Sequence, residues 1–468
     1  MNRKLILGAA AVLAGAGLTA LTLTGCGQGP ISGSSASGAN GAAMLVTVGD
    51  APLSNILSAR VTVSSISLTP SGGGSNVTVL SSPRTIELSS LGAIQEPIET
   101  ENVAAGTYSA VNIDISSAKV TYVDASGNVV TGTATVNSPN DTVTLNPTLT
   151  VTQGQDVNLR LNFNLAQSFD LTSSTLTFTP SITSVAASIE NENEADREIE
   201  VTGSVVSISS TSITVKSACT GVQSTFTINS STQFASNITA GSIKPGSIVT
   251  VRGAMQPDGS LLATMISAAM DGGAFGSSDG GGVGIVTAVT TDSGGNVTSF
   301  TFVPREDFSD FPGVSVTVSL ASSTTYGLSE GAVADGISPT AFTNAEIFPG
   351  QSVEVIGTLS SSTIAAQEVD LAPESLAGKL SAAPQGTAPD YTFTLQLPTQ
   401  SFLTTYDSLT TLNASTNSQT EYEDGLSSTS FASLAAGTAL EMHGYLLRDS
   451  SNNYSLTVSH ISQIETDN

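Results

Sequence analysis

The chain has 468 residues, which is long enough for several domains of roughly 100–200 residues each. Only 11% of the residues are charged and 5% are aromatic, with no Trp, and this composition is typical of short β-branched strands joined by small polar turns. The net charge of -26 argues against a nucleic-acid binder, which needs a basic surface, and against direct binding to anionic lipid headgroups. We therefore expect an all-β protein that binds no nucleic acid.

Residues 1–25 have the layout of a secretory signal. Arg3 and Lys4 precede an apolar run from Leu5 to Leu23, and small residues follow it. Because this run is also long enough for a transmembrane helix, the way it ends decides between the two.

The run ends in Leu23, Thr24, Gly25 and Cys26, which resemble the bacterial lipobox. The resemblance implies that the Cys26 thiol carries diacylglycerol, that the chain is cut before Cys26, and that the new amino group is acylated. Two or more acyl chains hold a protein at a bilayer, at about 0.8 kcal/mol per buried CH₂. The alternatives are a cleaved signal followed by an incidental cysteine, or an uncleaved anchor. Gly27 stands where an Asp would favour inner-membrane retention, which favours an outer-membrane or cell-surface address.

Cys219 is the other cysteine of the chain. A lipidated Cys26 cannot pair with it, so we expect no intramolecular disulfide. Cys219 follows a predicted strand, and no CxxC or other metal-ligand spacing surrounds it. We interpret it as a small, partly buried structural residue.

Residues 26–42 form a Gly/Ser-rich segment, predicted to be a flexible tether. From 43 to 187 apolar residues alternate with polar ones, which predicts half-buried strands and a β-sandwich. The alternation is clearest at Val61 and Val63, at Val111, Ile113 and Ile115, and at Val157, Leu159, Leu161, Phe163 and Leu165.

This segment resembles the bacterial family catalogued as domain of unknown function 4382. The likeness lies in Asp50-Ala51-Pro52, in Gly106-Thr107-Tyr108 and in the strand NLRLNFNL. Similar AGxY turns occur in prealbumin-like modules, and the resemblance implies a prealbumin/immunoglobulin-like sandwich with the Tyr packed inside it, but no established activity. We interpret Asp50 as an Asx-type turn residue and Asp114 as an outward strand position, and not as metal ligands.

Residues 188–200, SIENENEADREIE, are a dense charge run, and we expect 188–198 to be a solvated acidic linker. The DxDxDG spacing of a calcium loop is missing there.

The remainder contains an internal repeat. IKPGSIVTVRG (243–253), IFPGQSVEVIG (347–357) and LAAGTALEMHG (434–444) share an apolar residue, a Gly three residues on, two alternating apolar positions and a closing Gly. Upstream of each copy, a Thr stands two residues before an aromatic residue, and a Gly opens an earlier strand. These residues are Thr232 and Phe234, Thr324 and Tyr326, Thr420 and Tyr422, and Gly203, Gly284 and Gly378.

Short strands with Gly at the bends predict small closed barrels. We expect three OB-like β-barrel repeats over 199–270, 282–374 and 375–468, with a Gly-rich linker over 271–281. The copies resemble domain of unknown function 5666, a bacterial extracytoplasmic module. The third copy departs most from that pattern, with Leu440 and Met442 in place of the Val pair.

Catalytic motifs are missing. GSSDG (276–280) satisfies G-x-S-x-G but has no strand before it and no helix after it. His443 aligns with Arg252 and Ile356 in the other copies, which predicts a tolerant outward position, and His460 has no partner in sequence. We therefore expect no enzyme, no cofactor and no metal site.

Together these features predict a lipid-anchored extracytoplasmic bacterial protein of binding, adhesive or structural type, held at the membrane through Cys26 and facing an unknown protein or glycan partner. The alternative is an accessory subunit that docks onto an exported enzyme or a secretion or envelope complex.

Overall fold

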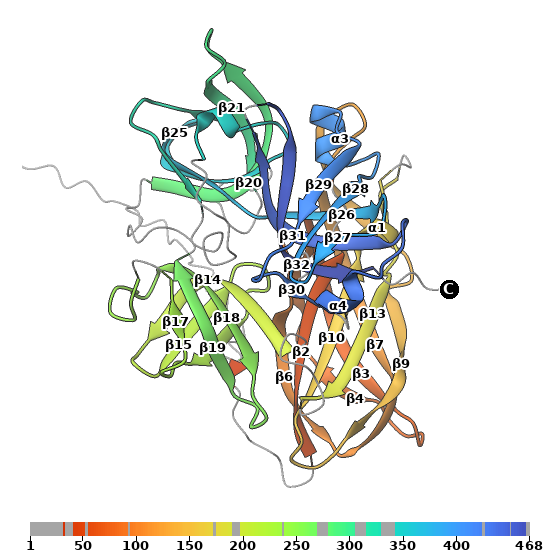
Figure 1. The fold of residues 1–468 in the computed structure, drawn as a ribbon. Coiled ribbons are helices and arrows are strands. Elements are labelled where there is room, and N and C mark those ends of the chain that lie inside the picture. Colours follow the sequence, from red (N-terminus) through yellow and green to blue (C-terminus); the bar gives the residue numbers. More distant parts are fainter. Residues whose placement is uncertain are drawn as a thin grey trace, which may run out of the picture.

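The computed structural model describes residues 31–32, 41–51, 55–91, 94–171, 175–189, 197–235, 238–268, 279–304, 315–328, 342–423, 426–449 and 451–464. Nearly all of its regular elements are strands, which confirms the all-β prediction. Figure 1 shows a sandwich followed in the chain by three barrels, here called barrels 1, 2 and 3.

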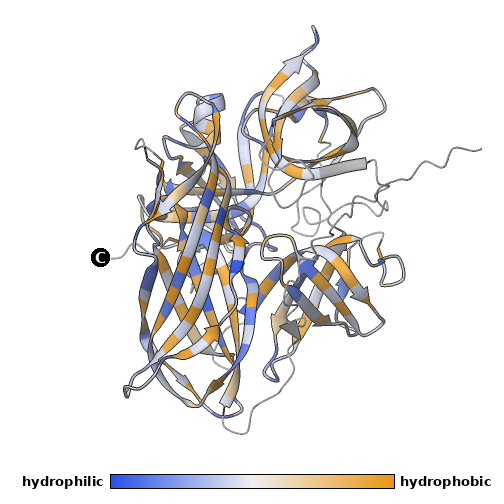
Figure 2. Cartoon of the chain, turned by 180° about the vertical axis from the view of Figure 1, so that it is seen from behind, coloured by the Kyte–Doolittle hydropathy of each residue, from blue (hydrophilic) through white to orange (hydrophobic). Residues whose placement is uncertain are grey.

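The first unit consists of two sheets packed face to face. Along their strands, apolar side chains alternate with polar ones (Figure 2), and the inward positions, such as Met44, Val46 and Val48, are buried. Burying each such side chain contributes about 1.5–3 kcal/mol.

One sheet of the sandwich has the order β13 (Ile182–Ser188), β10 (Val157–Asn164), β2 (Gly41–Ala51), β6 (Glu96–Ala104). The other has the order β11 (Phe169–Asp170), β12 (Thr177–Phe178), β8 (Val129–Val136), β7 (Gly106–Val123), β3 (Ile56–Pro70), β4 (Val77–Leu80), with β5 (Arg84–Glu87) on β3 and β9 (Asn140–Val151) on β7.

Two short helices complete the sandwich, η1 (Leu88–Ser90) and α1 (Leu165–Ser168). Tyr108 packs inside, 3% exposed, and its hydroxyl donates to the Ala104 carbonyl oxygen at 2.8 Å. This placement agrees with what the AGxY resemblance implies.

Each of the three repeats is a closed five-stranded barrel. In all three, the first three strands form a meander, the third pairs in parallel with the fifth, and the fourth closes the ring onto the first, as in OB-type barrels. Barrel 1 comprises β14 (Glu198–Ile208), β15 (Ser212–Ser217), β16 (Gln223–Thr227), β18 (Ile248–Met255) and β19 (Leu261–Ala268). Barrel 2 comprises β20 (Asp279–Thr291), β21 (Val297–Pro304), β22 (Val316–Ser319), β24 (Ser352–Ser360) and β25 (Thr363–Leu371), with η4 (Asn344–Glu346). Barrel 3 comprises β26 (Glu374–Leu380), β28 (Asp390–Gln396), β29 (Thr411–Ser415), β31 (Ala439–Arg448) and β32 (Tyr454–Gln463), with β27 (Gln385–Thr387), α3 (Phe402–Asp407) and α4 (Ser428–Phe431).

The repeated residues occupy equivalent places in the barrels. The Thr-x-aromatic motif leads into a short strand that pairs with the fifth strand: β17 (Gln233–Phe234), β23 (Thr325–Leu328) and β30 (Glu421–Tyr422). In each repeat template, the Gly three residues after the first apolar residue adopts a left-handed backbone conformation. Its φ is 91° at Gly246, 92° at Gly350 and 87° at Gly437. Each closing Gly adjoins a register shift between the fourth and fifth strands: Gly253, Gly357 and Gly444.

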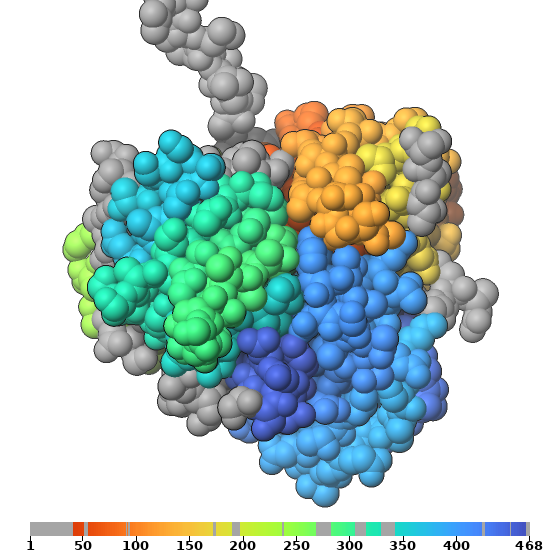
Figure 3. Space-filling model, turned by 90° about the horizontal axis from the view of Figure 1, so that it is seen from above, coloured from red at the N-terminus to blue at the C-terminus, as the bar shows by residue number. Residues whose placement is uncertain are grey.

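The four units pack against one another, and are not strung out on flexible linkers as the Gly-rich and acidic segments lead one to expect. Leu57 and Val123 of the sandwich, Ile285 and Val303 of barrel 2, and Phe402 of barrel 3 form one buried apolar cluster. Figure 3 shows the sandwich, barrel 2 and barrel 3 in contact on one face of the molecule. Apolar side chains at domain boundaries gain the same burial energy as a domain core, which explains this packing.

Polar contacts join barrel 1 to the sandwich and barrel 3 to barrel 2. The Ser217 hydroxyl donates to Glu96 at 2.7 Å. At the other boundary, the Arg448 guanidinium donates to the carbonyl oxygens of Ala345 at 3.1 Å and Ile347 at 3.3 Å.

The unit boundaries differ in places from those expected. β1 (Ile31–Ser32) pairs in parallel with β16 and lies wholly within 26–42, the segment that we predicted to be a flexible tether. β2 also begins inside that segment, at Gly41. Backbone groups at the edge of a barrel offer hydrogen bonds to any extended segment, whatever its side chains. β20 begins at Asp279, inside the predicted Gly-rich linker. The predicted linkers otherwise fall largely at 190–196 and 269–278, outside the described residues.

Candidate functional site

The predicted lipidation site cannot be placed in the fold. Leu23, Thr24, Gly25 and Cys26 lie outside the described residues. Among the described helices, none is both long and apolar enough to cross a membrane.

Cys219 is buried, 6% exposed, beside the sandwich core. Its backbone carbonyl oxygen accepts a hydrogen bond from the Glu87 N–H at 2.9 Å. This placement agrees with a structural role.

The two aspartates of the sandwich differ in their surroundings. Asp114 accepts a hydrogen bond from the Ser65 hydroxyl at 2.5 Å, on the polar side of β7. Asp50 is 3% exposed within β2, and neither carboxylate oxygen makes a hydrogen bond of ordinary geometry among the described residues, so the Asx-turn interpretation of Asp50 is wrong. Burial first, and then the negative charges of Glu441 and Glu87, raise the pKa of Asp50 well above its usual range.

The two histidines lie directly opposite each other on β31 and β32. His443 and His460 are register partners, their ring centroids are 6.0 Å apart, and both are buried. His443 Nδ1 hydrogen-bonds to the Ser375 hydroxyl at 3.0 Å. The prediction of an outward, tolerant position for His443 is therefore wrong, because this face of β31 is covered.

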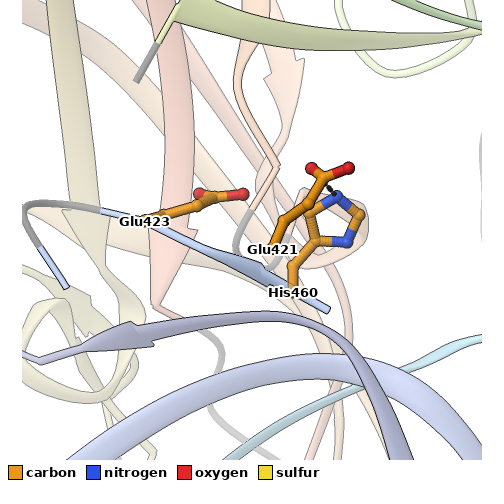
Figure 4. Close-up of side chains that lie close together, drawn as sticks. All are labelled: Glu421, Glu423 and His460. Atoms are coloured by element: carbon orange, nitrogen blue, oxygen red, sulfur yellow. Dashed lines mark ion pairs between the residues drawn. The ribbon is translucent and has the colours of Figure 1, made fainter. Parts of the chain in front are cut away.

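His460 forms a buried ion pair in barrel 3. Its Nε2 lies 3.1 Å from Glu421 Oε2, and its ring is only 4% exposed. Glu421 is on β30, in parallel register with His460 on β32, so the pair follows directly from strand pairing. Glu423, two residues on, has its carboxylate on the same side of the chain (Figure 4), and one ligand atom from each of the three residues lies within 4.8 Å of the others.

Barrel 1 adds charged residues to this cluster. The Glu198 side chain, at the start of β14, hydrogen-bonds Glu421. Nearby, Arg252 Nε of β18 is 2.7 Å from Glu200 Oε2, and both side chains are largely covered. We refer to these residues (Glu198, Glu200, Arg252, Glu421, Glu423 and His460) as the charged junction.

Protonation in the charged junction reflects burial and close contact. Burial, and then repulsion by Glu421, raises the pKa of Glu198 to about 8. Burial lowers the pKa of His460, but its ion pair and hydrogen bond with Glu421 outweigh burial and raise the pKa to about 10. Glu198 and His460 therefore both carry a proton at neutral pH, and Glu421 is the ionised partner of both.

The charged junction can hold protons or a cation between partly buried carboxylates. Its residues come from 198–200, 252, 421–423 and 460, so no local motif in the sequence marks it. The repeat alignment contained one signal, since it aligned His443 with Arg252, and each of these side chains contacts a polar or charged partner in its own barrel.

Two segments match family models. Residues 42–180 match a family described as Domain of unknown function (DUF4382), and residues 202–267 match one described as Domain of unknown function (DUF5666). The order and places of these matches confirm the first resemblance, and confirm the second for the first of the three repeats. A comparison with curated proteins gave no match.

Solved structures give only loose likenesses. The wild-type single-stranded DNA binding protein from Thermus aquaticus has 13% identity and a TM-score of 0.17, over 42% of this chain and 96% of that chain. A deletion mutant of the same Thermus aquaticus protein has the same identity and TM-score, over 41% and 96%. Drosophila Unr CSD456 has 10% identity and a TM-score of 0.14, over 57% and 98%.

Proposed function

We propose that this protein is a lipid-anchored extracytoplasmic bacterial protein with a non-catalytic binding, adhesive or structural role at the outer membrane or cell surface. The lipobox-like ending Leu23-Thr24-Gly25-Cys26 after an apolar run carries the proposal. Acylation at Cys26 supplies the membrane attachment that a surface of net charge -26 does not supply.

The packing of the four units supports a role in presenting a fixed surface. The apolar cluster at Leu57, Ile285 and Phe402 and the hydrogen bonds of Arg448 join units that are distant in sequence. A body joined in this way loses little conformational entropy when it binds a partner. An anchored protein of this form suits adhesion, or the binding of a protein or glycan at the cell surface.

The anchor is tested by labelling cells with a palmitate analogue. Cys26→Ala should abolish labelling and release the protein from the membrane fraction. Cys219→Ala is the matched control, because it removes the other cysteine and should leave both labelling and fractionation unchanged. Labelling retained by Cys26→Ala would contradict the lipid anchor.

The binding role is tested by cross-linking intact cells and identifying the captured neighbours. A surface protein or glycan captured with the anchored chain supports adhesion or binding. Stoichiometric capture of an exported enzyme would instead favour the accessory-subunit role. Absence of any saturable neighbour would count against both.

A further inference from the structure

Three side chains with metal-ligating atoms meet in barrel 3 at its contact with barrel 1. Glu421, Glu423 and His460 present one ligand atom each within 4.8 Å of the others (Figure 4), and Glu198 of barrel 1 hydrogen-bonds Glu421. This hydrogen bond therefore joins two units that are adjacent in space but separated by barrel 2 in the chain.

The spacing is close to what a small cation needs. In a tetrahedral zinc site with bonds of about 2.1 Å, neighbouring ligand atoms are about 3.4 Å apart. His460 Nε2 and Glu421 Oε2 are already 3.1 Å apart. The Glu423 ligand atom is within 4.8 Å of both, and Glu423 is partly buried.

The orientation of His460 is fixed by a residue outside the ligand set. The Ser459 hydroxyl donates to the His443 carbonyl oxygen at 3.0 Å, so the Ser459 oxygen is left to accept from His460 Nδ1, 3.2 Å away. Nδ1 therefore keeps its proton, and Nε2, which faces Glu421, is the nitrogen that binds a metal ion once it releases its own proton. Metal-bound histidines almost always have such a partner on the second nitrogen.

The donor atoms indicate the kind of cation. One imidazole nitrogen with carboxylate oxygens suits Zn²⁺, whereas Ca²⁺ and Mg²⁺ prefer oxygen ligands throughout. We propose that Glu421, Glu423 and His460 bind one Zn²⁺ in barrel 3, and that the hydrogen bond from Glu421 to Glu198 links this site to barrel 1. This site stands apart from the lipid anchor, since the two share no residue.

The proposal is tested by titrating Zn²⁺ into the purified, detergent-solubilised full chain after EDTA treatment and dialysis. We expect saturable binding of one Zn²⁺ per chain, and Ca²⁺ and Mg²⁺ at least tenfold weaker. Glu421→Gln and Glu423→Gln should each weaken Zn²⁺ binding at least tenfold. Glu354→Gln, at a buried glutamate on β24 of barrel 2, and Cys219→Ala should leave it unchanged.

Two results would overturn the site: no saturable Zn²⁺ binding by the wild-type chain, or Zn²⁺ binding that neither Glu421→Gln nor Glu423→Gln weakens. Glu423→Gln keeps the test valid if Glu421→Gln fails to fold, because Glu423 is partly exposed. Hydrogen exchange tests the link between barrels. Zn²⁺ should slow exchange in β14 as well as in β30 and β32, and protection confined to barrel 3 would refute the link.

Discussion

The Thr420 hydroxyl donates to the Val458 carbonyl oxygen at 2.7 Å and accepts the Asn417 N–H at 2.9 Å. Val458 opposes the closing glycine Gly444, next to the register shift between β31 and β32. A bulge removes ladder hydrogen bonds, and the threonine hydroxyl supplies one to the carbonyl beside it. The same bond joins Thr232 to Ala263 at 2.8 Å and Thr324 to Ala366 at 2.9 Å.

Replacing this threonine by valine keeps its shape and removes the hydroxyl. Thr420→Val and Thr324→Val should each cost about 1–3 kcal/mol, because both positions are buried and a backbone carbonyl loses its partner. Thr232→Val should cost less, since Thr232 is only partly buried. Hydrogen exchange of each barrel measures the effect. Thr420→Ser retains the hydroxyl and should recover most of the loss, and equal losses for Ser and Val would exclude the hydrogen bond as the cause.

The strand-opening glycines should tolerate alanine unequally. A Cβ built on Gly203 would overlap the Lys216 carbonyl oxygen, and one on Gly284 would overlap the Val303 carbonyl oxygen. At Gly378 the nearest atom, the Gln396 carbonyl oxygen, is 3.1 Å away. Forcing a methyl group into a closely packed place costs about 1–3 kcal/mol. Calorimetry should therefore show lower melting temperatures for Gly203→Ala and Gly284→Ala, and little change for Gly378→Ala. The reverse order would contradict close strand approach as the reason for glycine.

The barrels could be predicted from the sequence because their signals are local and repeated. Gly246 takes the turn, Gly253 lies at the bulge, and the Thr232 hydroxyl bonds the carbonyl beside it. All three residues recur in each copy within a short stretch of sequence. Such features depend on backbone geometry within one unit. They survive even in the third copy, where the apolar pair differs.

The charged junction could not be predicted in this way, because it depends on contacts between units. Glu198 and Glu421 meet only through the packing of barrels 1 and 3. His443 and Arg252 occupy equivalent positions and make different contacts: His443 faces Ser375 and His460, and Arg252 pairs with Glu200. In a single sequence, this variation is indistinguishable from exposure to solvent.

Asp50 should make stability depend on pH. Its raised folded-state pKa means that the folded chain binds a proton that the unfolded chain releases above about pH 3.9. The stability contributed by this group is therefore full below that pH and falls as the pH rises through the raised pKa. Asp50→Asn keeps the side chain neutral, so at pH 7 it should be more stable than the wild type, and the gain should vanish at about pH 3.5. Calorimetric melting at both pH values measures this.

Asp124→Asn is a control in which the expected dependence of stability on pH is the reverse of that at Asp50. The Asn128 N–H groups lower the pKa of Asp124, so this residue contributes stability above its ordinary pKa and loses it as the pH falls. Its substitution should cost stability at neutral pH and not at low pH. A gain for Asp50→Asn that is the same at both pH values would show that repacking, and not proton binding, is responsible.

Phe402 should hold three units together. Its ring is 3% exposed in the cluster with Leu57 of the sandwich and Ile285 of barrel 2, and Tyr406, one turn along α3, donates to the Gly127 carbonyl oxygen at 3.3 Å. Phe402→Ala should cost about 3–5 kcal/mol, and part of that loss should appear outside barrel 3.

Hydrogen exchange separates this junction from an ordinary core. Phe402→Ala should speed exchange at the start of β3 and in β20, which belong to other units, because the cluster they share loses its largest member. Phe393→Ala is the matched control, since Phe393 packs on Phe431 within the core of barrel 3. Its effect should stay within barrel 3. If both substitutions changed exchange only in barrel 3, the units would be held by the polar contacts of Ser217 and Arg448 and not by the shared apolar cluster.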